Sequence, residues 1–298
     1  IHHRLVGSEM CIRDRQANNV NGYINSFDSD GFTVVDGSSG GALVNYSSGG
    51  TTNTYVSWNW KAGGSASSNS NGSITSNVSA NTDAGFSIGT YTGNATAGAT
   101  IGHGLGAIPE VVIAKRRDNA RDWSVYHHNL TSTPTNAYTL LNSTAGTGLG
   151  ATAWNNGTFT TDVFTIGSHE LVNYSGDSYV FYAFKGIEGY SKIGSYVGNG
   201  NSSGTYVYTG FRPAFLLTKE ATATSGWNIR DSVRSPDNPV NEALQTDTTG
   251  TELTSNYNVD FLSNGFKLRT SASDSNTSSQ TYIYWAFAES PFKYANAR

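Results

Sequence analysis

Apolar side chains in this chain alternate with a period of two over short stretches, the pattern of a half-buried β-strand. Three stretches show the alternation most clearly: Val56, Trp58 and Trp60; Val180, Tyr182 and Phe184; and Ile283, Trp285 and Phe287. Two continuous apolar runs, at 111–114 and 215–217, each follow a proline and predict strands buried on both faces. Gly-Asn, Asn-Gly and Ser-Gly pairs mark turns between these runs. No stretch has helical periodicity over three turns, so the pattern predicts antiparallel β-sandwiches.

The composition agrees with short strands joined by tight turns. The 298 residues include 34 glycines, and 12% of the chain is aromatic. Charged residues make up 13%, about half the ~25% of an ordinary globular domain. The net charge of −4 gives no basic footprint for nucleic acid. No apolar run approaches the ~18 residues that predict a membrane span.

The first fifteen residues differ in composition from the rest. They contain the single methionine, Met10, the single cysteine, Cys11, and two of the six histidines. The string resembles a translated sequencing adapter, so residues 1–15 are expected to be an artefact, with a genuine N-terminal strand as the alternative. On the first interpretation the chain proper has no cysteine and is the C-terminal piece of a longer protein.

Four segments recur in the same order at a spacing of about 104 residues. The pairs are 88–94 with 193–199, 108–115 with 212–219, Trp123 with Trp227, and 179–184 with 282–287. A unit of this length is the size of a small domain. The sequence therefore predicts an all-β fold of tandem antiparallel β-sandwich repeats, with a jelly-roll-like topology.

A third, partial copy precedes these two. Residues 27–32 match 261–266, and residues 55–61 match 179–185. The predicted division is an artefact at 1–15, the C-terminal half of a truncated repeat at 16–63, and sandwich repeats at 86–188 and 189–298. Residues 64–85 are expected to be a Gly/Ser/Asn linker, or an extended arm if Ile74 and Val78 dock. The half unit should be poorly packed, or should borrow strands from the linker.

Large apolar residues at matching positions are predicted to fill the cores of the three copies. They are Phe32, Trp58 and Trp60 in the partial copy; Phe164, Tyr182 and Phe184 in the next; and Phe266, Trp285 and Phe287 in the last.

No catalytic or metal-binding motif stands out. There is no nucleophile elbow with suitable partners, no zinc spacing and no phosphate-binding loop. Asp118 and Asp122 flank Arg121, a cluster typical of a solvated loop. Adjacent strand residues point to opposite faces, so His127 and His128 cannot easily share one metal. The sequence thus predicts a non-enzymatic protein with no catalytic residues, metal or cofactor.

One constellation is a candidate ligand site. Its members are Lys115, Arg117, Trp123 and Tyr126 in one copy and Lys219, Trp227 and Arg230 in the other. Glycan sites combine an aromatic face, on which sugar CH groups stack, with polar groups that bind the hydroxyls. If this is the role, one of the two indole rings should keep an exposed face. The structural alternative is a tryptophan that anchors the next strand beneath the stems of the basic side chains.

The motifs resemble tandem repeats of tailed-phage and prophage tail-fibre and virion proteins, an uncharacterised β-sandwich family. The segments that carry this resemblance are 55–64, 89–94, 102–109, 115–117, 123–127 and the join 189–196. The last unit departs from the pattern, because residues 211–213 replace the Gly-Leu-Gly loop. The resemblance supplies no catalytic residues.

It implies a non-enzymatic phage virion structural protein, a tail fibre or appendage, with a role in host-surface or glycan adhesion. The expected partners are a cell-surface glycan or receptor, other virion proteins and further copies in a trimer, with no nucleic acid. The expected location is the virion or the extracellular space. Two alternatives stay open: a secreted bacterial array of carbohydrate-binding modules, and a polysaccharide-degrading enzyme, which the missing acid pair disfavours.

Overall fold

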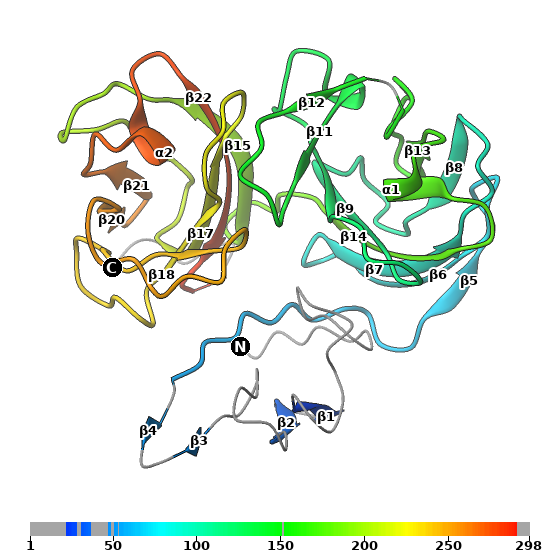
Figure 1. The fold of residues 1–298 in the computed structure, drawn as a ribbon, viewed down its shortest axis with the longest axis horizontal. Helices are drawn as coiled ribbons and strands as arrows, with labels where there is room; N and C mark the ends of the chain where they lie inside the picture. Colours follow the sequence, from blue (N-terminus) through cyan, green and yellow to red (C-terminus); the bar gives the residue numbers. More distant parts are fainter. Residues whose placement is uncertain are drawn as a thin grey trace.

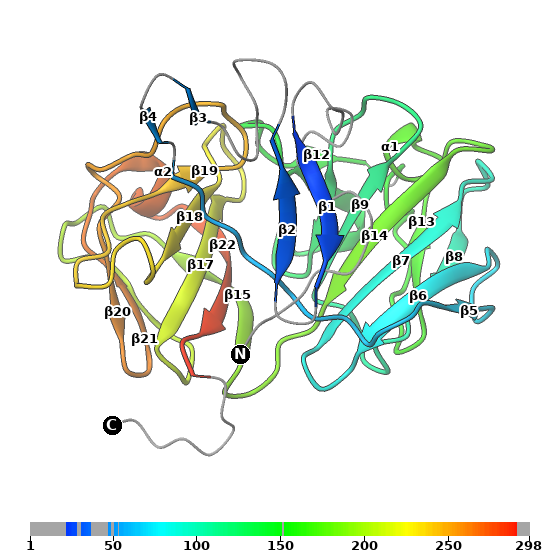
Figure 2. The same ribbon diagram turned by 90° about the horizontal axis from the view of Figure 1, so that it is seen from below.

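The computed structural model describes residues 22–28, 31–36, 47–48, 51–52, 54–150 and 152–290. Two β-sandwich units lie side by side: unit A, residues 64–188, and unit B, residues 189–290 (Figure 1). The described residues from 22 to 63 are called here the N-terminal segment, which Figure 2 shows in blue in front of the two units; its Trp60 packs on Phe184 of unit A and on Phe215 of unit B. The predicted all-β, antiparallel sandwich fold is confirmed. The expectations for residues 1–15 lie outside the described part of the chain.

Unit A is built on an eight-stranded antiparallel sheet with the order β12-β11-β10-β9-β14-β7-β6-β5. Its strands are β5 (Ser67–Asn69), β6 (Ser76–Asn81), β7 (Phe86–Thr92), β9 (Val111–Arg116), β10 (Ser124–His127), β11 (Ala137–Leu140), β12 (Gly148–Leu149) and β14 (Ser178–Phe184). The second layer holds the pair β8 (Ala99–Gly102) and β13 (Val163–Ile166). Two short helical turns complete the unit, η1 (Pro134–Asn136) and α1 (Glu170–Asn173).

Unit B has a five-stranded sheet, β15-β22-β17-β18-β19, and a three-stranded sheet, β16-β21-β20. The strands are β15 (Ser191–Val197), β16 (Tyr206–Tyr208), β17 (Pro213–Glu220), β18 (Asn228–Asp231), β19 (Leu244–Gln245), β20 (Val259–Leu262), β21 (Gly265–Leu268) and β22 (Thr281–Ala288). The helical turn α2 (Ser273–Asn276) precedes β22. The order β7-β14-β9-β10-β11 of unit A matches β15-β22-β17-β18-β19 of unit B.

The same contacts recur at matching positions of the two units. Tyr91 stacks on Tyr179 at 5.1 Å between ring centroids, and Tyr196 stacks on Tyr282 at 5.0 Å. The Tyr91 hydroxyl donates to the Val172 carbonyl, as that of Tyr196 does to the Ser275 carbonyl. The hydroxyl thereby fixes the helical turn to the sheet in each unit. The closeness of the turn also requires glycine at Gly93 and Gly198. A Cβ at either position would lie 2.2 Å from a carbonyl oxygen beside the turn.

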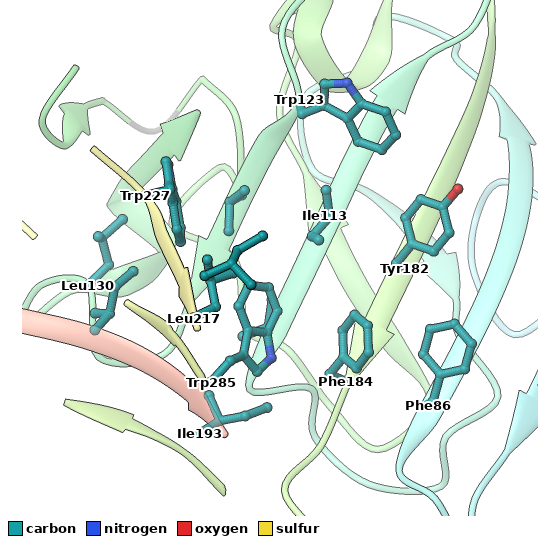
Figure 3. Packing of buried hydrophobic residues seen from close by; sticks show 14 of the residues in the cluster. Phe86, Ile113, Trp123, Leu130, Tyr182, Phe184, Ile193, Leu217, Trp227 and Trp285 are labelled. Atoms are coloured by element: carbon teal, nitrogen blue, oxygen red, sulfur yellow. The ribbon is translucent and has the colours of Figure 1, made fainter. Parts of the chain in front are cut away.

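Strand β14 shows why the central strands are apolar on both faces. Tyr179, Phe181 and Ala183 belong to the core of unit A. Tyr182 and Phe184 on the other face belong to a second cluster, which continues into unit B through Trp285. We call this second group the interface cluster (Figure 3). It joins residues of both units, among them Phe86, Ile113, Trp123, Leu130, Tyr182, Phe184, Ile193, Leu217, Trp227 and Trp285. A strand covered on both sides needs apolar residues at every position, not at alternate ones.

The prediction that all the large apolar residues fill unit cores is therefore only partly right. Phe164 and Phe266 are fully buried in the cores of units A and B. Tyr182, Phe184, Trp285 and Phe287 contribute instead to the interface cluster, because their strand faces point away from the second layer of their own unit. Phe32 is half-buried.

The expected strand at Val56, Trp58 and Trp60 is wrong, since residues 54–66 form no strand. The matching strands β14 and β22 are central, each paired with a neighbour on both sides, and the described part of the chain offers residues 54–60 no such neighbours. Both tryptophans nevertheless pack against the interface cluster.

Residues 64–85 dock as an arm, with Ile74 and Val78 buried in the core of unit A. Strands β5 and β6 extend the sheet of unit A beyond β7. The half unit therefore does not borrow these strands. In the N-terminal segment, β1 (Tyr23–Phe27) pairs with β2 (Phe32–Val35), and β3 (Ser47–Ser48) pairs with β4 (Thr51–Thr52).

Candidate functional site

The structure buries six of the seven residues predicted from the sequence to bind a ligand. They are Lys115, Trp123, Tyr126, Lys219, Trp227 and Arg230. Arg117 is exposed, directly after the end of β9. The basic and aromatic side chains therefore do not form one surface.

Trp227 and Lys219 lie where unit A meets unit B. The Trp227 indole Nε1 donates to the Leu140 carbonyl of unit A at 2.8 Å. The Lys219 Nζ donates to the carbonyls of Glu220, Thr144 and Ala223 at 3.2 to 3.4 Å. Burial lowers the pKa of Lys219 to about 8. These two side chains connect the units.

Trp123 occupies the matching position in unit A. Its ring stacks near Tyr182 at 6.2 Å, and the Lys115 Nζ lies 5.8 Å from the ring centroid. Trp123 is 3% exposed and Trp227 is 1% exposed. The expectation that one of these rings keeps an open face is therefore wrong. Each ring lies on the face of its sheet that forms the interface cluster, where apolar neighbours cover it.

Tyr126 and Arg230 occupy matching positions inside the two cores. Tyr126 packs on Phe159 at 4.4 Å in an apolar core. Arg230 donates instead to the Tyr257 carbonyl at 2.7 Å and to the hydroxyls of Thr218 and Ser275. Unit B thus holds a buried cation, Arg230, where unit A has the ring of Tyr126. The groups that accept hydrogen bonds from Arg230 make this part of unit B polar.

A polar pocket of about 630 Å³ opens in this region of unit B. It lies between the end of β17, the loop before β20 and the start of α2, and its lining includes Glu220, Ser225, Asn256, Tyr257 and Asp274. Five further serines and threonines contribute to the wall: Thr224, Ser255, Thr270, Ser271 and Ser273. The Ser225 hydroxyl is buried and has no hydrogen-bond partner among the described residues.

The electrostatics of the pocket are set by two carboxylates. Burial raises the pKa of Glu220, and the nearby charge of Asp274 raises it further, against the opposing effect of Lys219. Burial, with a contribution from Asp274, raises the pKa of Tyr257 to about 12, so its hydroxyl stays protonated. The pocket therefore offers carboxylate acceptors, a phenol and several hydroxyls.

Unit A lacks these carboxylates at the matching positions. Arg116 pairs with Tyr179 in the sheet as Glu220 pairs with Tyr282. The Arg116 side chain is buried, with its Nε 2.5 Å from an Asp177 oxygen and its guanidinium 4.2 Å from the Tyr174 ring centroid. In α1, Leu171 is buried where α2 has Asp274. The pocket thus belongs to unit B and is not a general feature of the scaffold.

Reasoning from the sequence missed Glu220, Asn256, Tyr257 and Asp274. The usable signal was the difference between the copies at matching positions: Arg116 against Glu220, and Leu171 against Asp274.

Two further features bear on the class of the protein. No group of three or more potential metal ligands occurs among the described residues. Within the same part of the chain, no helix is long and apolar enough to cross a membrane.

Fold and pocket together define an all-β sandwich protein with a hydroxyl- and carboxylate-lined pocket in one of its two units. The chain belongs to the family described as Domain of unknown function (DUF7483), whose model matches residues 4–291. The match starts inside the segment 1–15, whose status as an artefact stays a prediction. Comparisons with curated proteins and with solved structures gave no match.

Proposed function

We propose that this protein is a non-enzymatic structural component of a phage virion that binds host-surface glycans through the polar pocket of unit B. The virion role rests on the resemblance of its motifs to tail-fibre repeats. The adhesion role rests on the pocket, and the single observation that carries it is the combination of Glu220, Asp274 and Tyr257 in one concave site.

Sugar recognition needs several hydrogen-bond acceptors placed around a small volume, because each sugar hydroxyl exposes a donor and an acceptor. The carboxylates of Glu220 and Asp274 provide acceptors, and the serine and threonine hydroxyls provide both kinds of group. Hydrogen bonds to charged groups contribute more than neutral ones, about 1.5–3 kcal/mol each. Tyr257 adds an aromatic surface for the CH face of a sugar.

A glycan array probed with the labelled chain tests the adhesion role. We expect binding to a limited set of glycans, weakened at least tenfold by Glu220→Gln and by Tyr257→Ala. Glu188→Gln is the matched control, because it removes an exposed carboxylate outside the pocket. If the unaltered chain, the two pocket variants and Glu188→Gln all bound equally, or if none of them bound, the pocket would not be the glycan site.

The virion role has a separate test. An antibody against the chain should label purified phage particles from a host that carries the gene. Labelling confined to secreted bacterial protein would favour the alternative, an array of carbohydrate-binding modules.

A second candidate is glycoside hydrolysis, which the two carboxylates in one pocket favour. A raised pKa suits a general acid, and Glu220 has one, while Asp274 would act as base or nucleophile. If the chain released reducing ends from a bound glycan, and Glu220→Gln abolished that release, the pocket would be a catalytic site and not an adhesion site. We favour adhesion because Asp274 also lies near the buried charge of Arg230, which it helps to balance.

A further inference from the structure

Strand β16 lies at the edge of the three-stranded sheet of unit B, where it pairs with β21 and with no other strand of the described chain. Just outside β16, the Thr205 carbonyl and the Thr209 N–H bond to the β20–β21 hairpin. Bonded and non-bonded positions alternate in an antiparallel pair, so Val207 bonds to β21. The N–H and C=O groups of Tyr206 and Tyr208 therefore point to the open side, and no described residue bonds to them there.

Strand β8 of unit A is the counterpart of β16. It pairs with β13 as β16 pairs with β21, and in both pairs a fully buried phenylalanine lies opposite the middle of the edge strand. On this register, Thr100 and Gly102 of β8 match Tyr206 and Tyr208 of β16. The two strands thus turn the same backbone groups away from their partner strand.

The arm formed by residues 64–85 covers this edge in unit A. The Ile74 N–H donates to the Thr100 carbonyl at 3.1 Å, and Ile74 forms a parallel bridge to β8. The Ser76 hydroxyl donates to the Gly102 carbonyl at 2.7 Å. Both carbonyls that β8 turns outward are therefore bonded by the arm.

Unit B leaves the matching edge open. Only residues 185–190 separate β14 from β15, so the unit has no segment of its own that matches the arm. Tyr206 is 43% exposed and Tyr208 is 65% exposed. The Tyr206 hydroxyl donates to the Asn264 side-chain oxygen at 2.8 Å, and a Cβ on Gly265 would lie 3.1 Å from its ring. The ring thus leans over β21 and leaves the other side of β16 uncovered.

The arm shows what kind of segment fits such an edge. A Cβ on Gly72 would lie 2.3 Å from the Thr100 carbonyl oxygen, so glycine is required where the segment crosses that carbonyl. The Asn69 side chain lies 2.1 Å from the place of a Cβ on the β8 residue that matches Tyr208. A segment on β16 therefore needs a smaller residue than asparagine there, which excludes an unaltered arm from a second copy.

We propose that the open edge of β16 binds an extended segment of a partner protein, which adds a strand parallel to β16. The segment has the pattern Gly-x-Ile or Gly-x-Val, with a small residue three positions before the glycine. The N–H of its isoleucine or valine donates to the Tyr206 carbonyl, as Ile74 donates to Thr100. In strand addition, main-chain bonds supply the affinity and alternate side chains supply the specificity. No residue of β16 lines the polar pocket, so this site is independent of glycan binding.

The probe is a synthetic peptide of residues 70–81, which keeps the Gly-x-Ile pattern and omits Asn69. It is added at millimolar concentration to the ¹⁵N-labelled chain, and hydrogen exchange of the backbone amides is followed by NMR. Exchange at the Tyr206 and Tyr208 N–H groups should slow at least fivefold. The Val207 N–H, which already faces β21, is the internal control and should not change. The same peptide with alanine in place of its glycine should have no effect. Unchanged exchange with the first peptide would overturn the proposal.

Two variants separate strand addition from stacking on the tyrosine rings. Tyr206→Pro removes an outward N–H and keeps the bonds to β21, because an edge strand tolerates proline where its nitrogen faces solvent. Strand addition predicts at least fivefold weaker peptide binding by Tyr206→Pro, whereas Tyr206→Ala should bind within twofold of the unaltered chain. Binding that survives the proline but is lost with the alanine would assign the affinity to the ring, as for a sugar, and would overturn strand addition. The measurement on the unaltered chain depends on neither variant.

Discussion

His127 should make the association of the two units sensitive to acid. Its ring is fully buried at the junction of the units, with Nε2 3.4 Å from the Tyr284 carbonyl and Nδ1 accepting from the backbone N–H of Asn129. These two contacts suit the neutral ring with its proton on Nε2. Burial, and to a smaller extent the charge of His128, lowers the pKa of His127 to about 3.

The size of the effect follows from the difference between the two pKa values. In the unfolded chain a histidine has a pKa near 6.5, so the unfolded state takes up a proton first as the pH falls. The contribution of the neutral ring to the free energy of unfolding is fully present above pH ~6.5. It is lost progressively as the pH falls from ~6.5 to ~3. At pH 5 the loss amounts to about 2 kcal/mol, at roughly 1.4 kcal/mol for each pH unit below 6.5.

Chemical unfolding at pH 7 and pH 5 measures this loss, for the unaltered chain and for His127→Gln. Glutamine stays neutral and keeps a donor that can reach the Tyr284 carbonyl. The variant should lose about 2 kcal/mol less than the unaltered chain between the two pH values, whatever its stability at pH 7. Identical pH dependence in the two proteins would refute the assignment of a buried neutral ring at this junction.

The remaining predictions concern stability. Trp285→Ala should cost about 3–5 kcal/mol in the free energy of unfolding, since the ring is buried in the interface cluster; a loss below 1 kcal/mol in denaturant titrations would contradict its burial. Trp227→Phe should cost about 0.5–1.5 kcal/mol because it removes the indole hydrogen bond to the Leu140 carbonyl, which keeps only the longer bond from the Ser143 N–H, and Trp123→Phe should cost less in the same assay. Asn276→Ala should cost at least about 2 kcal/mol, because its buried amide donates to three oxygens; retained thermal stability would show those bonds to be dispensable.

The local pattern of apolar and polar residues was enough to predict the main strands and the all-β fold class. The alternation at 179–184 and 282–287 and the runs after Pro109 and Pro213 correspond to β14, β22, β9 and β17. The pattern could not say which face of β14 turns to its own unit, because both faces are apolar. It also failed at 54–60, where the residues favour a strand but the described chain supplies no strand neighbours.

The candidate site was harder to predict for a physical reason. Trp123, Trp227 and the basic residues near them suit a sugar site by type, but the same types suit an interface or a core, and the structure buries all of them except Arg117. The pocket instead combines residues from three separate loops, none of which forms a motif by itself. Only tertiary structure brings Glu220 within range of Asp274.

Calorimetric titration of the unaltered chain and of Asp274→Leu, with a glycan selected on the array, tests the adhesion claim most directly. Leucine is what unit A carries at the matching position, where Tyr126 replaces the buried Arg230 that Asp274 helps to balance, so thermal unfolding of the variant accompanies the titration. The account predicts measurable binding by the unaltered chain and at least a tenfold weaker affinity for the variant, about 1.4 kcal/mol. Equal affinity of the two proteins, with both folded, would contradict glycan binding in the pocket of unit B.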